Sequence, residues 1–174
     1  WHEDAFKLAK DENINLFSTP FSERAVDLLE KYNVPIYKIA SFEINDFKLL
    51  KAVAKTKKPI ILSTGMSSLK EINNTLKFMN KYNKKIIILH CISGYPTPEK
   101  EANLLGIRTL QNFFPKNLVG LSDHTSNSNT AIASIPYNPC LIEKHFNYDG
   151  KKSHDSKFSI NSMQLKDLVN KTHL

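Results

Sequence analysis

Arginine, cysteine and glycine are scarce in this 174-residue sequence, and each scarcity excludes a class of protein. Arg24 and Arg108 are its two arginines, so almost all of the net charge of +7 comes from scattered lysines. Because no arginine-rich run occurs and aromatic residues are not interleaved with basic ones, the charge indicates a solvated surface and no nucleic-acid partner. Cys91 and Cys140 form no CxxC pair, which excludes a four-cysteine zinc site. Both adjoin apolar segments, so we expect buried thiols in a reducing, cytoplasmic compartment.

Long hydrophobic runs and glycine-rich loops are also missing. No apolar segment approaches the roughly 20 residues of a membrane-spanning helix, so no membrane partner is expected. The opening residues, WHEDAFKLAK, lack the apolar core of a signal peptide. Neither GxGxxG nor GxxxxGK occurs, which argues against a nucleotide-binding, doubly wound sheet. The sequence begins without methionine and within a helical pattern, so we expect a fragment of a longer chain.

The sequence repeats one unit, in which a short apolar run precedes a longer stretch of helical period. The runs are INLF (14–17), PIYKIAS (35–41), PIILST (59–64), KIIILHC (85–91), NLVGLS (117–122) and CLIEKHF (140–146). Between them, apolar residues recur three or four positions apart, as in helices. Asp46, and Ser67 or Ser68 with Glu71, are predicted helix caps.

Near-continuous apolar strands that are covered by helices are typical of a parallel sheet. Six such units without a topological break therefore predict an α/β fold of the (β/α)8 TIM-barrel type. Because a full barrel takes ~250 residues, about the first two βα units are expected to be missing.

Polar side chains follow every predicted strand, at the end where parallel barrels build their active sites. In chain order they are Ser18 and Thr19; Lys38, Ser41 and Glu43; Ser63 and Thr64; His90, Ser93 and Tyr95; Ser122, Asp123 and His124; and Glu143, Lys144 and His145. Turns favour serine and threonine, but six such endings in register are more than turns explain. Hydroxyls clustered with a lysine predict a phosphate or carboxylate site, because each donates a hydrogen bond to anionic oxygen.

Two neighbouring strands end in a histidine. His124 and His145 are expected at the mouths of adjacent strands about 4.8 Å apart, so their imidazoles can meet at one point. Two imidazoles with carboxylate or water oxygens suit a divalent metal that keeps positions open for substrate. His90 also lies at a strand end, where it is equally compatible with a buried ring packed beside Cys91. Polar, helical or terminal contexts predict surface positions for His2, His154 and His173.

The charged residues beside these histidines admit more than one role. Asp123 is compatible with a metal ligand, with a partner that orients His124, or with a helix-start residue. Because side chains alternate along a strand, Glu143 should share a face with His145 while Lys144 points toward the helices. Glu143 is also compatible with a simple ion pair to Lys144.

With these residues in hand, the sequence resembles the sialic acid synthase family, the nonulosonic acid synthases, in six ordered segments that cover nearly the whole chain. They are FSTPF (17–21), YKIASFE (37–43), KPIILSTGM (58–66), LHCISGYPTP (89–98), GLSDHT (120–125) and IEKHF (142–146). YKIASFE and the later HDSKFSI (154–160) are most similar to the pseudaminic acid synthases. The resemblance implies an enzyme of carbohydrate biosynthesis that condenses phosphoenolpyruvate with an open-chain N-acetylated amino sugar and releases phosphate. It also implies a homodimer when the chain is full length.

The resemblance also implies the roles of individual residues. Phosphoenolpyruvate would be bound by Thr19, Lys38, Ser41, Ser63 and Ser122, and by Ser93, a position that is asparagine in some members. Tyr95 and Asp155 would contact the sugar, and Glu43 would lie near the reacting centre, which makes Glu43, Lys38 and Tyr95 the expected catalytic residues. His124 and His145 would hold the divalent ion, usually manganese or magnesium.

The sequence departs from the family pattern in three places. The first two strands, which supply an acidic residue and a further lysine in the family, and the C-terminal antifreeze-like domain have no counterpart in residues 1–174. Before IEKHF, the small-residue stretch of the family is replaced by SIPYNPC (134–140). We therefore expect residues 1–174 to form a partial TIM-barrel synthase domain that is inactive on its own.

Two other functions stay open at this point. Lys38 is conceivable as the Schiff-base lysine of an aldolase, although such a lysine needs a desolvated pocket and the neighbouring serines favour a phosphate ligand. The chain is also compatible with a non-catalytic, phosphosugar-binding remnant.

Overall fold

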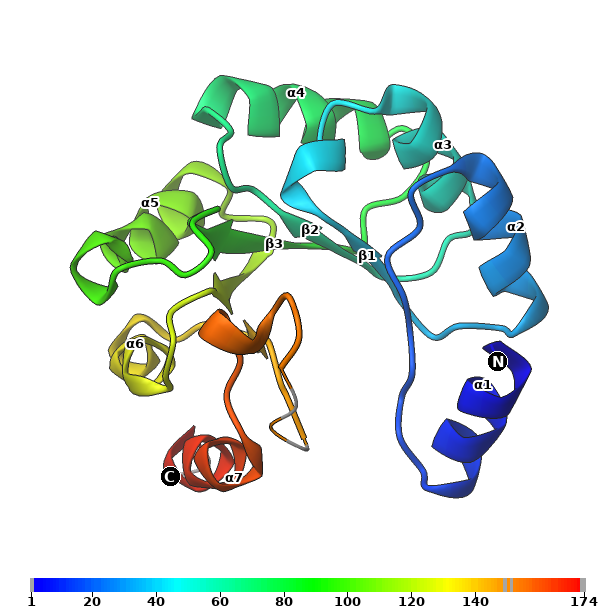
Figure 1. Ribbon diagram of the computed structural model, residues 1–174. Coiled ribbons are helices and arrows are strands. Elements are labelled where there is room, and N and C mark those ends of the chain that lie inside the picture. Colours follow the sequence, from blue (N-terminus) through cyan, green and yellow to red (C-terminus); the bar gives the residue numbers. More distant parts are fainter. Residues whose placement is uncertain (1, 149, 151, 173–174) are drawn as a thin grey trace. The chain divides into compact units, whose positions relative to one another are not determined.

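Helices and strands alternate along the chain in the computed structural model, which describes residues 2–148, 150 and 152–172 (Figure 1). The helices are α1 (His2–Asp11), α2 (Glu23–Lys31), α3 (Phe47–Lys55), α4 (Leu69–Met79), α5 (Leu105–Phe113), α6 (Asn129–Ala133) and α7 (Ser162–Thr172). The strands are β1 (Tyr37–Ile39), β2 (Ile60–Ser63), β3 (Ile86–Cys91), β4 (Leu118–Asp123) and β5 (Ile142–Lys144). They form one sheet in chain order, and both β1 with β2 and β4 with β5 pair in parallel. The predicted α/β class is therefore confirmed.

The chain divides into two compact units. The first, which extends to Ser63 and resumes over Ser67–Ile87, carries β1, β2 and helices α1 to α4. Helices α2, α3 and α4 lie beside one another along β1 and β2 (Figure 1). Its core consists of fully buried aliphatic side chains such as Leu50, Val53 and Leu62.

The predicted caps in the first unit are present. The Asp46 carboxylate accepts hydrogen bonds from the backbone N–H groups of the first turn of α3, at 3.1 and 3.0 Å. Ser68 and Glu71 form a reciprocal capping box at the start of α4. Each cap satisfies N–H groups that a helix start leaves without partners.

The second unit comprises Thr64–Met66 and the chain from Ile88 onward, with most of β3, α5, β4, α6, β5 and α7. Helices α6 and α7 enclose a small core around Ala131, Ile160 and Leu168. The segment SIPYNPC forms a short 3-10 turn (Ile135–Tyr137) that ends at Asn138. Asn138 has φ 51°, a left-handed conformation that asparagine tolerates better than most residues. Residues 139–141 connect this turn to β5.

Two expectations about local structure are wrong. Residues 14–17 are not a strand: the N–H of Ile14 still bonds to the carbonyl of Ala9 at the end of α1, and the Ile14 side chain is 64% exposed. A short apolar run without a pairing partner gains too little burial to form a strand. Cys140 is exposed because it lies in the connection before β5, whereas Cys91, inside β3, is buried as expected.

Helix α7 and the short turn before it were not anticipated from the sequence. Within the described ranges, every helix is too short or too polar to cross a membrane.

Candidate functional site

The pairing of β4 with β5 brings the two strand-end histidines together. Ser122 lies opposite Glu143, and Asp123 lies opposite Lys144, in the parallel register. The next residue on each strand is a histidine, and the ring centroids of His124 and His145 are 5.2 Å apart.

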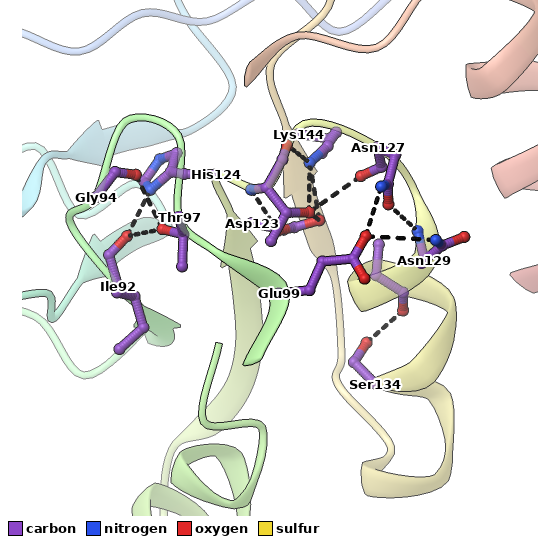
Figure 2. A network of polar contacts seen from close by, with 12 residues as sticks. Ile92, Gly94, Thr97, Glu99, Asp123, His124, Asn127, Asn129, Ser134 and Lys144 are labelled. Carbon is purple, nitrogen blue, oxygen red and sulfur yellow. Dashed lines mark hydrogen bonds and ion pairs between the residues drawn. The ribbon is translucent and has the colours of Figure 1, made fainter. Parts of the chain in front are cut away.

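The ring of His124 is held by the connection that follows β3. Its Nδ1 lies 2.9 Å from the carbonyl oxygen of Ile92, and the thiol of Cys91 lies 3.8 Å from the same nitrogen. Thr97 also binds this carbonyl, and its backbone N–H donates to the carbonyl of His124 (Figure 2). Because a carbonyl only accepts hydrogen bonds, Nδ1 of His124 carries the proton, which leaves Nε2 with a lone pair for a cation.

His145 has a similar arrangement with a carboxylate. Its Nδ1 lies 3.4 Å from Oδ2 of Asp155, so Nε2 is again the nitrogen left for a ligand. Burial and the neighbouring His124 lower the pKa of His145, so this ring stays neutral at neutral pH, the form that binds metals. Burial by itself would lower the pKa of His124, but the contacts with Cys91 and the Ile92 carbonyl outweigh burial and raise it.

Two aromatic side chains border the histidine pair. The ring of Tyr95 lies 4.3 Å from His124, and the ring of Phe158 lies 4.8 Å from His145, centroid to centroid. Tyr95 is 45% exposed and Phe158 is buried. Sequence reasoning placed Tyr95 and Asp155 with the sugar but missed Phe158, although it belongs to the segment HDSKFSI. Phe158 supports the His145 ring from the side.

Asp123 has a different role from the three that the sequence left open. Its Oδ2 lies 2.9 Å from Nζ of Lys144, and its Oδ1 accepts a hydrogen bond from the N–H of Thr125. The carboxylate is therefore engaged away from His124, and helix α6 begins after Ser128. Glu143 accepts a hydrogen bond from the Ser122 hydroxyl at 2.6 Å, while Lys144 forms its ion pair with Asp123. Alternation of side chains then places Glu143 and His145, the residue that follows β5, on the same side of this segment.

The first unit holds the other group of predicted site residues. Lys38 in β1 is 8% exposed, and its ammonium lies 3.3 Å from the carbonyl of Ile39. Ser41 is buried in the 3-10 turn Ser41–Glu43 that follows β1. Burial, with the charge of Asp46, raises the pKa of Glu43 more than nearby Lys38 lowers it.

Thr19 and Ser63 complete that group. Thr19 is partly buried in the segment before α2, and Ser63, at the end of β2, is 2% exposed. Because Leu62 pairs with Ile39, Ser63 lies level with the residues that follow β1.

Three predicted site residues carry a buried oxygen that has no hydrogen-bond partner within the described part of the chain. They are Glu43 and Ser63 in the first unit and Ser93 in the second, through Oε2 and the two Oγ atoms. Buried polar atoms are almost always paired, and an unpaired one costs about 1–3 kcal/mol. Such atoms mark places where a ligand can supply the missing partner.

The histidine pair fits a divalent ion in one way: the protein would supply two imidazoles and would leave the other coordination positions of the ion open. Among the described residues, no group of three or more histidine, cysteine and acidic side chains is arranged to hold a metal. The protein therefore offers two Nε2 atoms, both oriented by hydrogen bonds through Nδ1, which is how metal-binding histidines are usually fixed. The remaining positions would fall to water or substrate oxygens.

His90 is a buried core histidine. Its Nε2 lies 2.9 Å from the carbonyl of Ala102, and Gly106 leaves room for the ring, since a Cβ at this glycine would approach it to 2.5 Å. Burial lowers the pKa of His90 despite the carbonyls of Ala102 and Asn103. His2 and His154 are exposed as expected, and His173 lies outside the described residues.

The lowered pKa of His90 predicts a loss of stability in acid. A histidine that is buried neutral contributes stability in full above its unfolded pKa of about 6.5 and loses it as the pH falls toward the lower folded value. Urea unfolding at pH 8.0 and pH 5.5 should show a smaller loss for His90→Gln than for the unaltered chain. Equal losses would contradict the assignment of His90 as a neutral core residue.

The chain is similar to known proteins over nearly its whole length. The model of the NeuB family matches residues 1–174. The chain is 40% identical over 171 residues to the pseudaminic acid synthase of Helicobacter pylori, a match that covers 97% of this chain and 50% of that protein. It is 41% identical over 169 residues to the N,N'-diacetyllegionaminic acid synthase of Campylobacter jejuni, covering 95% of this chain and 50% of that protein.

A solved structure is similar over nearly the whole chain. The N-acetylneuraminic acid synthetase of Leptospira borgpetersenii, in complex with citrate, superimposes with a TM-score of 0.93 at 32% identity and covers 98% of this chain and 61% of that one. The chain spans about half the length of the curated relatives that it matches.

Proposed function

Because the chain belongs to the NeuB family over its whole length, we propose that it is the partial TIM-barrel domain of a nonulosonic acid synthase of the pseudaminic acid type. In this proposal the first two βα units of the barrel and a C-terminal antifreeze-like domain belong to the rest of a longer, homodimeric and cytoplasmic enzyme. The substrates are phosphoenolpyruvate and an open-chain N-acetylated amino sugar. The observation that carries the proposal is the pair of imidazoles on β4 and β5, 5.2 Å apart, each bound through Nδ1 so that Nε2 is available.

His124 and His145 would hold the divalent ion, manganese or magnesium. Bound there, the ion would polarise the sugar carbonyl as a Lewis acid. The chain supports this by keeping both rings in the tautomer that a metal requires: Ile92 does so for His124, and Asp155 does so for His145. Tyr95, beside both rings and half exposed, is suited to contact the sugar.

The anion-binding role belongs to hydroxyl and ammonium donors. Carbon–carbon bond formation at C3 of phosphoenolpyruvate ends in loss of phosphate, so the site must bind a phosphate and a carboxylate throughout the reaction. Lys38, Ser41 and Ser63 supply such donors in the first unit, with Thr19 before α2, and Ser93 and Ser122 supply them in the second. Donors that are already in place stabilise developing negative charge without reorganisation.

Glu43 is suited to move a proton near the reacting centre. Its raised pKa and its unpaired Oε2 are properties of a carboxyl group that works as an acid or a base. Lys38, close enough to affect that pKa, would keep the negative charge of the substrate near this carboxyl group.

Ser63 provides a test of the anion-binding role. Ser63→Ala removes a buried hydroxyl that has no partner in the described chain, so the free energy of unfolding should not fall and should rise by up to about 1–3 kcal/mol. Affinity for phosphoenolpyruvate, measured by calorimetry, should fall about tenfold, the loss of one charge-assisted hydrogen bond. The matched control is Ser134→Ala, because the buried Ser134 hydroxyl donates to the Ala131 carbonyl. That variant should lose stability and keep the affinity. The reverse pattern would count against the assignment.

The function itself is tested by product analysis of the full-length protein with phosphoenolpyruvate and a panel of N-acetylated amino sugars. We expect release of phosphate together with a nine-carbon acid, sensitive to chelators and restored by manganese. Borohydride trapping with pyruvate should leave Lys38 unmodified. A trapped adduct on Lys38 would instead support the Schiff-base aldolase, and binding without turnover would support a phosphosugar-binding remnant.

A further inference from the structure

A buried ion pair joins the ends of β4 and β5 beside the histidine pair. Nζ of Lys144 lies 2.9 Å from Oδ2 of Asp123, and the two side chains are 4% and 1% exposed. The same ammonium donates to the carbonyl and the hydroxyl of Thr125, and the Thr125 N–H donates to the other oxygen of Asp123. The ion pair is therefore buried, and each of its charged groups has a further hydrogen-bond partner in Thr125.

The position of this pair in the strands relates it directly to the histidines. Asp123 immediately precedes His124, and Lys144 immediately precedes His145. Side chains alternate between the two faces of a strand, so the ion pair lies on the opposite face from the two imidazoles. On the imidazole face, the Ser122–Glu143 hydrogen bond joins the same two strands. One polar contact on each face thus connects the strands directly before the histidines.

A slip of one residue between these strands would turn every side chain of the slipped strand to the other face. Strand β5 has only three residues, Ile142–Lys144, and two further backbone hydrogen bonds, from Cys140 to Val119 and from Leu121 to Leu141, precede it, so the backbone pairing that opposes such a slip is short. A slip would also separate Lys144 from Asp123 and leave two charges buried without partners, which is strongly unfavourable.

From this geometry we infer that the Asp123–Lys144 pair is a positioning device that fixes the register of β4 and β5 and thereby keeps the His124 and His145 rings side by side. The inference rests on the proposed function in treating this ring pair as the metal site. It extends that proposal to two residues that touch neither substrate nor ion. Buried ion pairs contribute little net stability, because desolvation offsets the attraction, and register specification is their best-attested use.

The test removes both charges at once. Asp123→Asn combined with Lys144→Met leaves no uncompensated charge in the interior, so the double variant should still fold. Glu30→Gln combined with Lys58→Met is the matched control, because it makes the same chemical change in the ion pair of the first unit, where the two atoms lie 2.7 Å apart. Circular dichroism establishes that both double variants are folded. If the first double variant does not fold, Asp123→Asn combined with Lys144→Gln takes its place, since it also leaves no uncompensated charge and keeps an acceptor for Thr125.

Two measurements on chain 1–174 carry the test. One is the nuclear Overhauser effect between the ring protons of His124 and His145 in metal-free protein. The other is the affinity for Mn²⁺, measured by electron paramagnetic resonance. The Asp123/Lys144 variant should lose the ring–ring signal and bind Mn²⁺ at least tenfold more weakly, in the range expected for residues that orient metal ligands. The Glu30/Lys58 variant should change neither.

The outcomes separate this inference from the proposed function. An undiminished ring–ring signal in the Asp123/Lys144 variant overturns the positioning role, whatever happens to metal binding. If the unaltered chain binds no Mn²⁺, the metal assignment fails, and the ring–ring signal alone decides the inference. A ring–ring signal lost equally in both variants would also overturn it, since a general loss of structure would then explain the result.

Discussion

Lys144→Met is expected to lower the free energy of unfolding by about 3–5 kcal/mol, the usual cost of removing one partner from a buried ion pair. The carboxylate of Asp123 stays behind at 1% exposure, where the N–H and the hydroxyl of Thr125 are its remaining partners among the described residues. Urea unfolding followed by circular dichroism measures the change.

The ion pair of the first unit provides the comparison for this prediction. Lys58→Met removes the same type of side chain, but the Lys58–Glu30 pair is 20% and 40% exposed, so the expected loss is no more than about 1 kcal/mol. Adding Asp123→Asn to Lys144→Met should restore part of the lost stability, because it removes the uncompensated charge. Equal losses for Lys144→Met and Lys58→Met would show that Lys144 is not held in a buried pair.

His124→Ala is expected to abolish measurable Mn²⁺ binding by chain 1–174, because it removes one of the two imidazoles that are proposed to hold the ion. In the full-length enzyme the same change should reduce turnover by roughly 100- to 1,000-fold, the equivalent of several kcal/mol of charge stabilisation by a metal ion. Calorimetric titration with Mn²⁺ and a phosphate-release assay measure the two effects.

His90→Gln is the control for His124→Ala. It also replaces a buried strand-end histidine of the second unit, but one that is bound to the Ala102 carbonyl and packed against Gly106. It should leave Mn²⁺ affinity unchanged. Loss of metal binding in both variants would point to a general disturbance of the unit, and loss in neither would remove His124 from the site.

The repeating pattern of strands and helices could be predicted because each element carries a local signal. The apolar runs that form β1 to β5 are nearly continuous. The caps at Asp46 and Ser68 are hydrogen bonds to residues two or three positions further along the chain, so a short stretch of sequence is enough to predict them. Residues 14–17 have the same composition but form no strand, since strand formation depends on a pairing partner as well as on apolar character.

Part of the candidate site could also be predicted, because it depends on local sequence patterns. Side chains alternate along any strand, so the sequence was enough to predict that Glu143 shares a face with His145 and that Lys144 points to the other face. The partner of Asp123 depends on the register between β4 and β5, which no local pattern specifies, and so the Asp123–Lys144 pair was missed. The same holds for Phe158 beside His145, which comes from a turn after β5.

The central claim is that His124 and His145 share one divalent cation. Crystals of chain 1–174 soaked in Mn²⁺, with data collected at the manganese absorption edge, test it most directly. The account predicts one anomalous peak at bonding distance from Nε2 of both histidines, with Nδ1 of His124 still bound to the Ile92 carbonyl. Manganese bound by only one of these rings, or at another group of side chains, would contradict it.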